Sequence, residues 1–529
     1  MGVLKLLTST VAVSGVTLLW ALPAAGSVIL FAWSAADLSA WQALLQHPQV
    51  PQAAALSVWT GLAGLALSLA FALLITLAYP RPAAFSVAGL AIPHLAFSIG
   101  FGFLIMPSGL IARVFVGGDS PPQWVSTQDP WGLSLIACLA LKETPFLLAM
   151  IWSYLARADV RVSLAGQTRA ARSLGHGTGS LWLRVLLPQI LPRLIWPLII
   201  IWVYGATVVD MALVIGPTQP PTLSLIIWAD LNNADAALNA RGVAGASLLS
   251  LIVAGIAGLA YLAVISNSRH FMWSGPSRTS APLWPGRVLV AILPLLYGLI
   301  LAVLILMAWA RQWPYPQLLP GSLTLPSWGQ LQGPLLLSTG LALLTTASAI
   351  GLGVLWFETI GQQRDTLLTS LSVAALGIPA LVIGGGQYRL FLEAGLTGTF
   401  FGLTLAHLTA VFAYVVIVLT GPYRAFDPKY RAVAYGLNAG HVRFWFKVKL
   451  PLLKAPLLTA AAVGFSVSMA QFVPAQLVAA GRFSTLPMEA VTLASGGSRS
   501  LTAAYALALT IMPALAFFGA HWFGRPRWS

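Results

Sequence analysis

The sequence predicts an all-α integral membrane protein with about twelve transmembrane helices, arranged as two homologous halves of six helices each. Hydrophobic residues make up 58% of its 529 residues and charged residues only 8%, a composition that excludes an ordinary soluble domain. Apolar runs of about 20 residues, the length that crosses a bilayer, recur along the whole chain. A polar loop of twenty residues also occurs twice, 263 residues apart, as expected for a duplicated fold.

The apolar runs give the order of the predicted spans. The first run follows Lys5 and contains small residues at 21–25, a pattern that a secretory signal would also have. Eleven further runs behind it favour an uncleaved membrane anchor. The predicted spans are residues 8–33, 54–79, 84–106, 131–155, 190–216, 243–267, 287–310, 335–357, 367–388, 399–420, 456–480 and 501–524.

The charge distribution predicts the orientation in the membrane. The formal net charge is +15, and 21 of the 28 basic residues fall in segments on one side of the predicted spans. Because a basic bias marks cytoplasmic loops, we expect both termini and both repeated loops in the cytosol. The basicity therefore indicates topology in a lipid bilayer and no nucleic-acid partner. The single Cys138 excludes an intrachain disulfide and a cysteine-based metal cluster, and no metal site is expected.

Repeated motifs set the predicted domain boundaries. Ile92-Pro93 in the third span recurs as Ile378-Pro379 in the ninth. We expect an N-terminal transmembrane half at 1–266 and a C-terminal half at 286–529, related by a pseudo-twofold axis. Between them, residues 267–285 are polar and rich in turn formers, so they are expected to form a cytosolic linker.

The repeated loop is predicted to be a helix-turn-helix. Its first copy spans residues 169–188 and its second 432–451. Each copy has the pattern of a short helix, a sharp turn, a second short helix and a Leu-Pro pair entering the next span. The turn position holds Gly175 in one copy and Asn438 in the other. Both residue types accept the left-handed backbone that often ends a helix.

The second helix of the loop is expected to expose apolar and aromatic side chains among basic ones. An interfacial helix lying on lipid headgroups would have a similar composition. The recurrence of the whole twenty-residue register favours docking to a protein partner instead. The side chains concerned are Leu181, Trp182 and Arg184 in the first copy, and Phe444, Trp445, Phe446 and Lys447 in the second.

The loop resembles the coupling loop of bacterial ABC importer permeases, whose pattern is Glu-Ala-Ala-x3-Gly-x9-Ile-x-Leu-Pro. Arg169 and Ala432 replace the glutamate, and Val433 replaces the middle alanine, so a contact of that glutamate is not carried over. The matching positions are Ala170, Ala171, Gly175, Val185, Leu187 and Pro188 in the first copy, and Ala434, Asn438 (at the glycine), Val448, Leu450 and Pro451 in the second.

The resemblance implies a type I ABC importer permease, most similar to the single-chain permeases of ferric-iron and thiamine importers. It implies a multi-pass protein of the bacterial inner (plasma) membrane that moves a small solute. Its implied partners are two copies of an ABC ATPase subunit, which bind ATP, and a periplasmic or extracellular solute-binding protein. Leu181, Trp182 and Trp445 would lie in the groove of the ATPase.

The sequence itself predicts no catalytic site. No Gly-Lys dipeptide occurs, so the chain lacks a phosphate-binding loop of the G-x4-G-K-[ST] type. We therefore expect neither an enzyme activity nor a cofactor on this chain. The sequence leaves the substrate open.

Three ionisable residues inside predicted spans are candidates for a translocation pathway. Lys142 and Glu143 lie in the fourth span and Asp210 toward the outer end of the fifth. Charged groups in the membrane are costly and commonly functional; structural pairing with a polar group on a neighbouring span is the alternative. Adjacent helical residues project about 100° apart, so Lys142 and Glu143 are not expected to face each other. The second half holds Leu405, Ala406 and Val473 at these positions.

The main alternative function is a twelve-span secondary transporter driven by an ion gradient. Such transporters usually place their long cytosolic loop between the halves. Here the long basic loops lie between spans four and five of each half, which favours the permease. A membrane scaffold or polytopic enzyme is a further, less favoured alternative.

Overall fold

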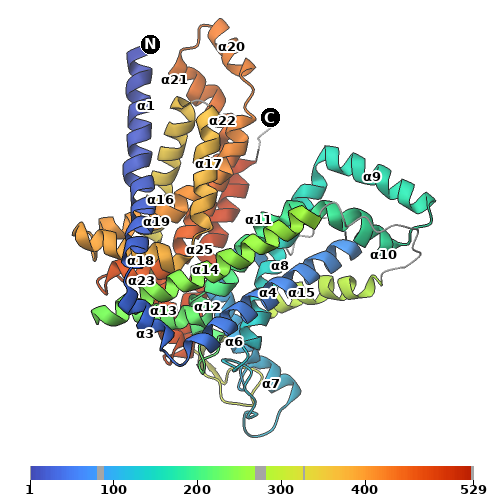
Figure 1. Cartoon of the computed structure of the whole chain (residues 1–529). Coiled ribbons are helices and arrows are strands. Elements are labelled where there is room, and N and C mark those ends of the chain that lie inside the picture. The colour runs from blue at the N-terminus through green and yellow to red at the C-terminus, as the bar shows by residue number, and fades with distance from the viewer. Residues whose placement is uncertain (1, 80–88, 268–281, 326–327, 361, 526–529) are drawn as a thin grey trace. The chain divides into compact units, whose positions relative to one another are not determined.

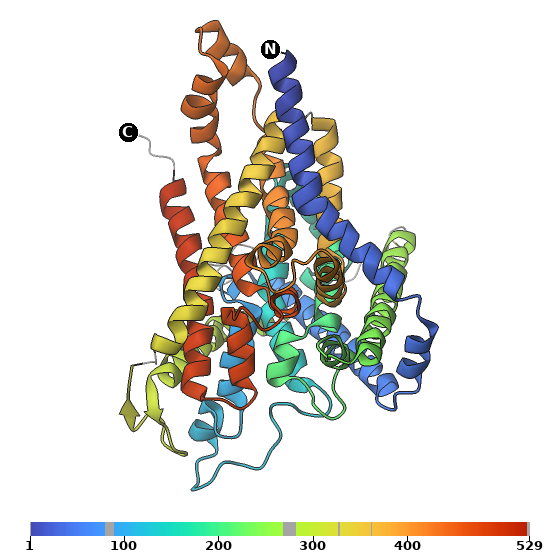
Figure 2. The ribbon, with the colours of Figure 1, turned by 90° about the vertical axis from the view of Figure 1, so that its left-hand side faces the viewer.

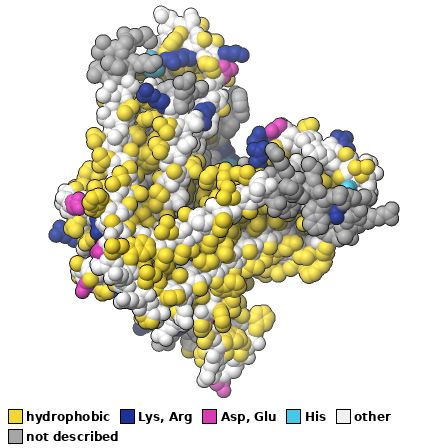
Figure 3. All heavy atoms as spheres, in the orientation of Figure 1, with side chains coloured by type: hydrophobic (Ala, Val, Ile, Leu, Met, Phe, Trp, Pro, Cys, Tyr) yellow, Lys and Arg dark blue, Asp and Glu magenta, His cyan; other side chains and the backbone are white. Residues whose placement is uncertain are grey.

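The computed structural model describes residues 2–79, 89–267, 282–325, 328–360 and 362–525 (Figure 1). Over these residues the chain is helical apart from a small antiparallel ribbon of β1 (Ala310–Gln312) and β2 (Ser322–Leu323). Within the described residues, eleven helices are long and apolar enough to cross a membrane, or twelve if one bent pair counts as a span. The predicted fold class is confirmed. In Figure 3, hydrophobic side chains cover the flanks of the long helices, and lysines and arginines gather near helix ends.

The chain divides into two compact units that cut across the predicted halves. Unit 1 contains Met1–Asp37 and Leu325–Ser529, and unit 2 contains Leu38–Thr324. The first helices of each predicted half, 1–266 and 286–529, therefore pack with the remaining helices of the other half. The predicted linker 267–285 lies almost wholly outside the described residues.

Unit 2 is organised around α4 (Val50–Ala78), which packs on α8, α11 and α15. Gly61 allows this close approach, since a Cβ there would lie 2.9 Å from the backbone nitrogen of Ala206. The other elements of unit 2 are α3 (Leu38–Leu45), α6 (His94–Ile105), α7 (Leu110–Phe115), α8 (Leu133–Ala156), α9 (Ala158–Ser173), α10 (Thr178–Leu181), η2 (Trp182–Leu186), α11 (Leu187–Thr207), α12 (Asp210–Ile215), α13 (Leu223–Leu231), α14 (Ala236–Asn267) and α15 (Trp284–Trp309).

Unit 1 is built around α19 (Phe400–Arg424), which packs on α16, α17 and α22. The N-terminal helices α1 (Gly2–Val16), η1 (Thr17–Ala21) and α2 (Leu22–Ser34) run along this unit, with α1 beside α16 (Figure 2). The other elements are α16 (Trp328–Thr359), α17 (Gln362–Leu376), α18 (Ala380–Glu393), α20 (Lys429–Gly436), α21 (His441–Phe444), η3 (Trp445–Lys449), α22 (Leu450–Ala470), α23 (Val473–Ala479), α24 (Leu486–Ala494) and α25 (Arg499–Gly524).

Several predicted spans prove to be broken. The ninth, 367–388, bends by 100° between α17 and α18, because Pro379 begins a new helix. The fifth, 190–216, breaks between α11 and α12, where Val208 is extended. The eleventh, 456–480, breaks at the equivalent Gln471. Both of these spans also start earlier than predicted, because the helix is continuous from residue 178 and from residue 441.

The fourth and tenth spans form the enclosed centre of each unit. In α8 and in α19, 72% of the most apolar window is buried within the protein. By contrast, only 17% of the equivalent window of α14 is buried. Polar residues of α8 and α19 are therefore screened from lipid by their own unit.

Arg113 holds together two loops of unit 2. Its side chain is nearly buried, at 5% exposure. Nε donates to the carbonyl of Ser108 (2.9 Å), Nη1 to that of Pro314 (2.8 Å) and Nη2 to that of Trp313 (3.0 Å). The guanidinium also stacks 4.8 Å from the ring centroid of Trp313. One cation thus satisfies several backbone acceptors that the loop folds bury.

Replacing Arg113 by methionine should lower the thermal stability of the detergent-solubilised protein by several degrees. The buried carbonyls lose their donors, at about 1–3 kcal/mol for each unsatisfied group. Thermal unfolding followed by tryptophan fluorescence is the measurement. Arg311, which is exposed on β1, provides the control: its change to methionine should leave the midpoint in place. Equal midpoints for both variants would contradict the proposed clamp.

Candidate functional site

The first repeated loop has the predicted turn. Gly175 has a φ of +82°, between α9 and α10. Its N–H donates to the carbonyl of Arg172 (3.0 Å), and the N–H of His176 donates to that of Ala171 (3.0 Å). This pair of bonds is a Schellman motif, which satisfies the last carbonyls of a helix. At the start of α9, the Arg157 guanidinium hydrogen-bonds Asp159 and lowers the pKa of that carboxyl.

The second loop repeats the turn geometry of the first. Asn438 has a φ of +57°, between α20 and α21. Its N–H donates to the carbonyl of Tyr435 (3.0 Å), and that of Ala439 to Ala434 (2.9 Å). The prediction that both turns use a left-handed residue is therefore confirmed. Figure 1 shows each loop at the end of a long helix of its own unit, α9–α10 beside α11 and α20–α21 beside α22.

The exposure predicted for the second helix was partly wrong. Leu181 and the equivalent Phe444 are buried, at 4% and 3% exposure. They pack inward because a helix of four residues must use one face to hold on to the preceding helix. Ala171 and Ala434 are also buried, at 7% and 6%. Trp182 and Trp445 are half-buried. Phe446 is exposed as predicted (59%), and further exposed apolar side chains of the loops are Leu174 (69%), Leu183 (63%) and Leu437 (78%).

The sequence suggested that each loop ends at its Leu-Pro pair, but the helix continues through that pair. A π-helix of five residues lies at each junction: η2 joins α10 to α11, and η3 joins α21 to α22. The wider π-turn removes the clash that Pro188 or Pro451 would make with the preceding α-helical turn. The predicted motif residues along this junction are mostly half-buried, namely Val185, Leu187, Pro188, Val448 and Leu450. Two others, Ala170 and Pro451, are exposed. Each loop therefore continues into a membrane span as one helix.

The second loop also carries a groove of about 510 Å³. Its walls include Tyr430, Val433 and Leu437 on one side and Phe444 and Lys447 on the other. The groove is mostly apolar with basic residues at its margin. It can accept an apolar side chain of a partner whose surface is acidic.

Within the membrane, unit 2 contains a polar cluster centred on His94. Glu143 Oε1 lies 2.7 Å from His94 Nε2, and Asp210 is the first residue of α12, close after the break in the fifth span. The His94 ring also lies 4.5 Å from that of Tyr204. Lys142 points elsewhere and donates to the carbonyl of Gly89 (3.1 Å). The divergence of Lys142 and Glu143 agrees with their predicted directions.

Sequence reasoning missed His94. The only signal was its position directly after the Ile92-Pro93 break, where a new helix begins. In the described residues, no group of three or more His, Cys, Asp or Glu side chains could hold a metal ion. Glu143 pairs with His94, and Lys142 pairs with a backbone carbonyl. Both charged residues therefore have structural partners, as the alternative of structural pairing predicted.

The corresponding cluster of unit 1 is neutral. His407 on α19 contacts the Ser468 hydroxyl through Nδ1 (2.9 Å). The amide of Gln471, at the break in the eleventh span, donates to the His407 carbonyl (3.0 Å). His407 is 2% exposed. Each unit thus places a histidine near a broken span, but His94 pairs with a carboxylate whereas His407 contacts a hydroxyl.

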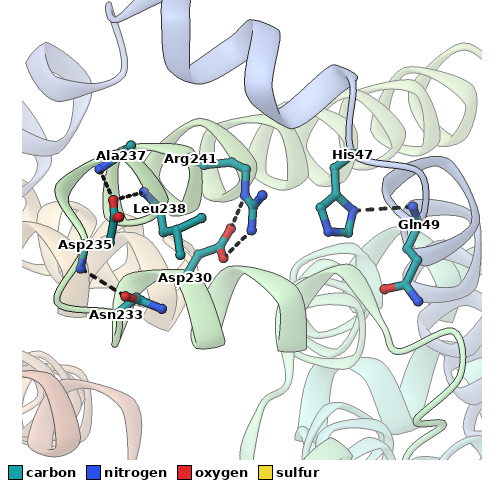
Figure 4. Close-up of polar contacts among 8 residues, drawn as sticks. All are labelled: His47, Gln49, Asp230, Asn233, Asp235, Ala237, Leu238 and Arg241. Carbon is teal, nitrogen blue, oxygen red and sulfur yellow. Dashed lines mark hydrogen bonds and ion pairs between the residues drawn. The ribbon is translucent and has the colours of Figure 1, made fainter.

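A further polar group shapes the hairpin of α13 and α14 (Figure 4). Arg241 forms a two-bond ion pair with Asp230, at 2.8 Å for each bond. Asp235 accepts from the N–H of Ala237 (2.7 Å), and Asn233 accepts from that of Asp235 (2.9 Å). These contacts lie within one hairpin, so they fix its turn and the start of α14.

The fold and the loops together define the class of this protein. It is a polytopic helical membrane protein in which each sequence repeat carries the same basic helix-turn-helix at the end of a span. That arrangement is typical of the membrane subunit of a transporter.

Comparison with known proteins identifies the family. No protein-family model matches the chain. It is 32% identical over 513 residues to the inner membrane ABC transporter permease protein YnjC of Escherichia coli K12, and the match covers 94% of each chain. The chain therefore belongs to the inner-membrane ABC transporter permeases, of the binding-protein-dependent import type. Like other permease subunits it is not an ATPase; ATP binding lies on a partner ATPase.

Two shorter similarities concern permeases of named transport systems. The molybdenum transport system permease protein ModB of Mycobacterium tuberculosis is 28% identical over 259 residues, which cover 46% of this chain and 94% of ModB. The spermidine/putrescine transport system permease protein PotC of Haemophilus influenzae is 26% identical over 119 residues, which cover 22% of this chain and 46% of PotC.

Replacing Gly175 by valine should loosen the first loop. A Cβ at this position would meet no atom within 4 Å, so the penalty comes from the positive φ alone, about 1–2 kcal/mol. Faster tryptic cleavage after Arg172 in the purified protein is the expected result. Gly175→Asn is the matched control, because Asn438 occupies the same turn in the second loop. Unchanged cleavage of the valine variant would mean that the left-handed turn is not required.

Proposed function

We propose that this chain is a single-chain permease whose two repeated loops dock on two copies of an ABC ATPase. The observation that carries the proposal is the exact recurrence of the loop: the same Schellman turn, the same buried anchor and the same π-helical junction, 263 residues apart. The ModB match supports two permease-sized repeats, since 94% of ModB aligns with 46% of this chain.

The continuous helices suggest how nucleotide-driven movement reaches the membrane. One helix runs from Thr178 to Thr207 and the other from His441 to Ala470. A helix is stiff over this length, so a displacement at the loop moves the span up to its break at Val208 or Gln471. Closure of two ATPase subunits would thus act directly on the fifth and eleventh spans.

The exposed apolar residues define the proposed contact. Leu183 and Phe446 occupy equivalent positions and point away from their own loops. Leu181, by contrast, anchors the loop internally. We propose that Leu183 and Phe446 insert into the ATPases, with Trp182 and Trp445 half-covered beside them. The groove beside Phe444 would receive a side chain from the ATPase that faces the second loop.

The basic bias of the loops supports cytosolic termini and cytosolic docking. The other side would then receive the substrate from a solute-binding protein. The halves 1–266 and 286–529, joined by a cytosolic linker at 267–285, remain the proposed units of duplication. The similarity to ferric-iron and thiamine permeases suggests small solutes. The matched permeases are named for molybdenum and for spermidine/putrescine, so the transported solute differs among relatives.

Truncating the proposed anchors should separate the permease from its ATPase. Leu183→Ala and Phe446→Ala each remove an exposed apolar side chain, and a buried interface anchor commonly contributes ~2 kcal/mol or more. Co-purification of the co-expressed ATPase should fall severalfold for each variant and further for the pair. Phe401→Ala, another exposed phenylalanine (54%), is the control and should retain the ATPase. Full retention in the double variant would refute docking through these side chains.

We propose that Glu143, which pairs with His94, and Asp210 face the solute during translocation, whereas Lys142 is structural. Glu143→Gln keeps a hydrogen-bonding group beside His94 but removes the charge. Uptake into proteoliposomes, with molybdate and spermidine as first probes, should change at least tenfold for one charge class of solute. Asp210→Asn should act in the same direction. The ATPase should still co-purify. Unchanged uptake with wild-type protein levels would leave only the structural role.

A further inference from the structure

Glu358 connects the second loop to a different span. It lies in the last turn of α16, and one carboxylate oxygen, Oε1, receives two donors from η3. The indole Nε1 of Trp445 is 3.0 Å away and the Lys449 Nζ is 2.8 Å away. The Glu358 and Lys449 side chains are only 16% and 14% exposed. Trp445 and Lys449 are four residues apart and therefore share a face of the helix.

Aromatic side chains enclose this ion pair. The Lys449 ammonium lies 4.9 Å from the ring centroid of Tyr423 and 5.3 Å from that of Phe426. Phe426 continues the contact to the buried Phe444 of the loop, with ring centroids 6.3 Å apart. Removing water strengthens both the ion pair and the cation–π contacts. The second loop is consequently fastened to the cytosolic ends of α16 and α19.

The first loop has no equivalent of the ion pair. The loop register places Trp182 opposite Trp445, but Leu186 opposite Lys449. The second and eighth spans align through Thr60-Gly61 and Thr339-Gly340, which places Tyr79 opposite Glu358. Tyr79 is 51% exposed, and neither a tyrosine nor a leucine can form this charge pair. The tryptophan is thus common to both loops, and the two charges are specific to the second.

We infer that Glu358 is a positioning residue that links the second loop directly to α16 as well as to α22. A displacement of the second loop reaches α22 through helix continuity and α16 through Glu358. Tyr79 and Leu186, at the equivalent positions of the first repeat, cannot form this Glu–Lys link. This inference rests on the proposed docking of the loops to the ATPases.

The test measures movement of the spans in the assembled complex. Single cysteines replace exposed residues at the far ends of the two helices, Gln332 on α16 and Gln52 on α4, in a Cys138→Ser background. Their rates of reaction with a maleimide are compared with and without Mg-ATP plus vanadate. In Glu358→Gln, which keeps an acceptor for Trp445, the nucleotide-induced change at position 332 should fall at least fivefold. The change at position 52 should persist.

Two further variants complete the test. Tyr79→Phe, at the matched position, should leave both responses intact. Combining Glu358→Gln with Lys449→Met should be no worse than Glu358→Gln alone, since both remove one interaction. An unchanged response at position 332, or additive losses in the double variant, would overturn the role of the pair.

Three further outcomes separate stability, docking and positioning. If Glu358→Gln does not accumulate in the membrane, Trp445→Phe provides the test, because it removes only the indole donor. It should lower the response at position 332 and not at position 52; equal lowering at both would overturn the inference. If Leu183→Ala and Phe446→Ala leave the ATPase bound, the docking proposal itself fails. If Glu358→Gln leaves the response at position 332 unchanged while the ATPase remains bound, the positioning role is refuted and the docking proposal stands.

Discussion

The structure depends on one constraint: a backbone polar group inside a membrane must find a partner within the protein. Both units meet it in the same way where short helices begin beside broken spans. The N–H of Leu223, at the start of α13, donates to the hydroxyl of Ser57 on α4 (2.9 Å). The N–H of Leu486, at the start of α24, donates to Ser338 on α16 (2.8 Å). These serines are almost fully buried, at 1% and 3% exposure.

The same constraint explains where the spans can break. The fifth span is interrupted at Val208, whose carbonyl accepts from the hydroxyl of Ser224 (2.8 Å). A break without such a donor would leave a carbonyl in hydrocarbon, at a cost of several kcal/mol. A side-chain hydroxyl thus satisfies the backbone at this break, and the amide side chain of Gln471 lies at the break in the eleventh span. Asp210, one of the residues proposed to face the solute, begins the helix after the break in the fifth span.

Composition and periodicity predicted the all-helical membrane fold, and the turn residues Gly175 and Asn438 predicted the loop geometry. These features are local: hydropathy follows from consecutive residues, and a left-handed turn from one residue. The packing of α1–α2 and of α15 could not be predicted in this way. An apolar span fits any apolar neighbour equally well by composition. Its partner is decided by close approach, as where a Cβ at Gly386 would overlap the carbonyl of Ser27.

The candidate functional site could be predicted from the sequence to a similar extent. The repeat identified both loops, but the inward direction of Leu181 depends on a helix of only four residues, too short for a periodic pattern. His94 escaped notice because a single histidine in an apolar run has no pattern at all. Its partner Glu143 lies 49 residues away on another helix. Contacts of this range appear only after the helices are packed.

Joining two permease repeats in one chain has a consequence for where charge can be placed. In a pair of identical subunits every charged residue occurs twice, on both sides of the twofold axis. A single chain with two repeats can instead carry a charged residue in one repeat only. Unit 2 uses this freedom inside the membrane, where Glu143 lies beside His94, whereas His407 of unit 1 contacts a serine hydroxyl. Unit 1 uses it at the end that carries the second loop, where Glu358 and Lys449 stand at the positions of an exposed tyrosine and a leucine. The backbone geometry of the loops stays symmetric because it depends on turns and buried anchors, while the costly buried charges occur once each.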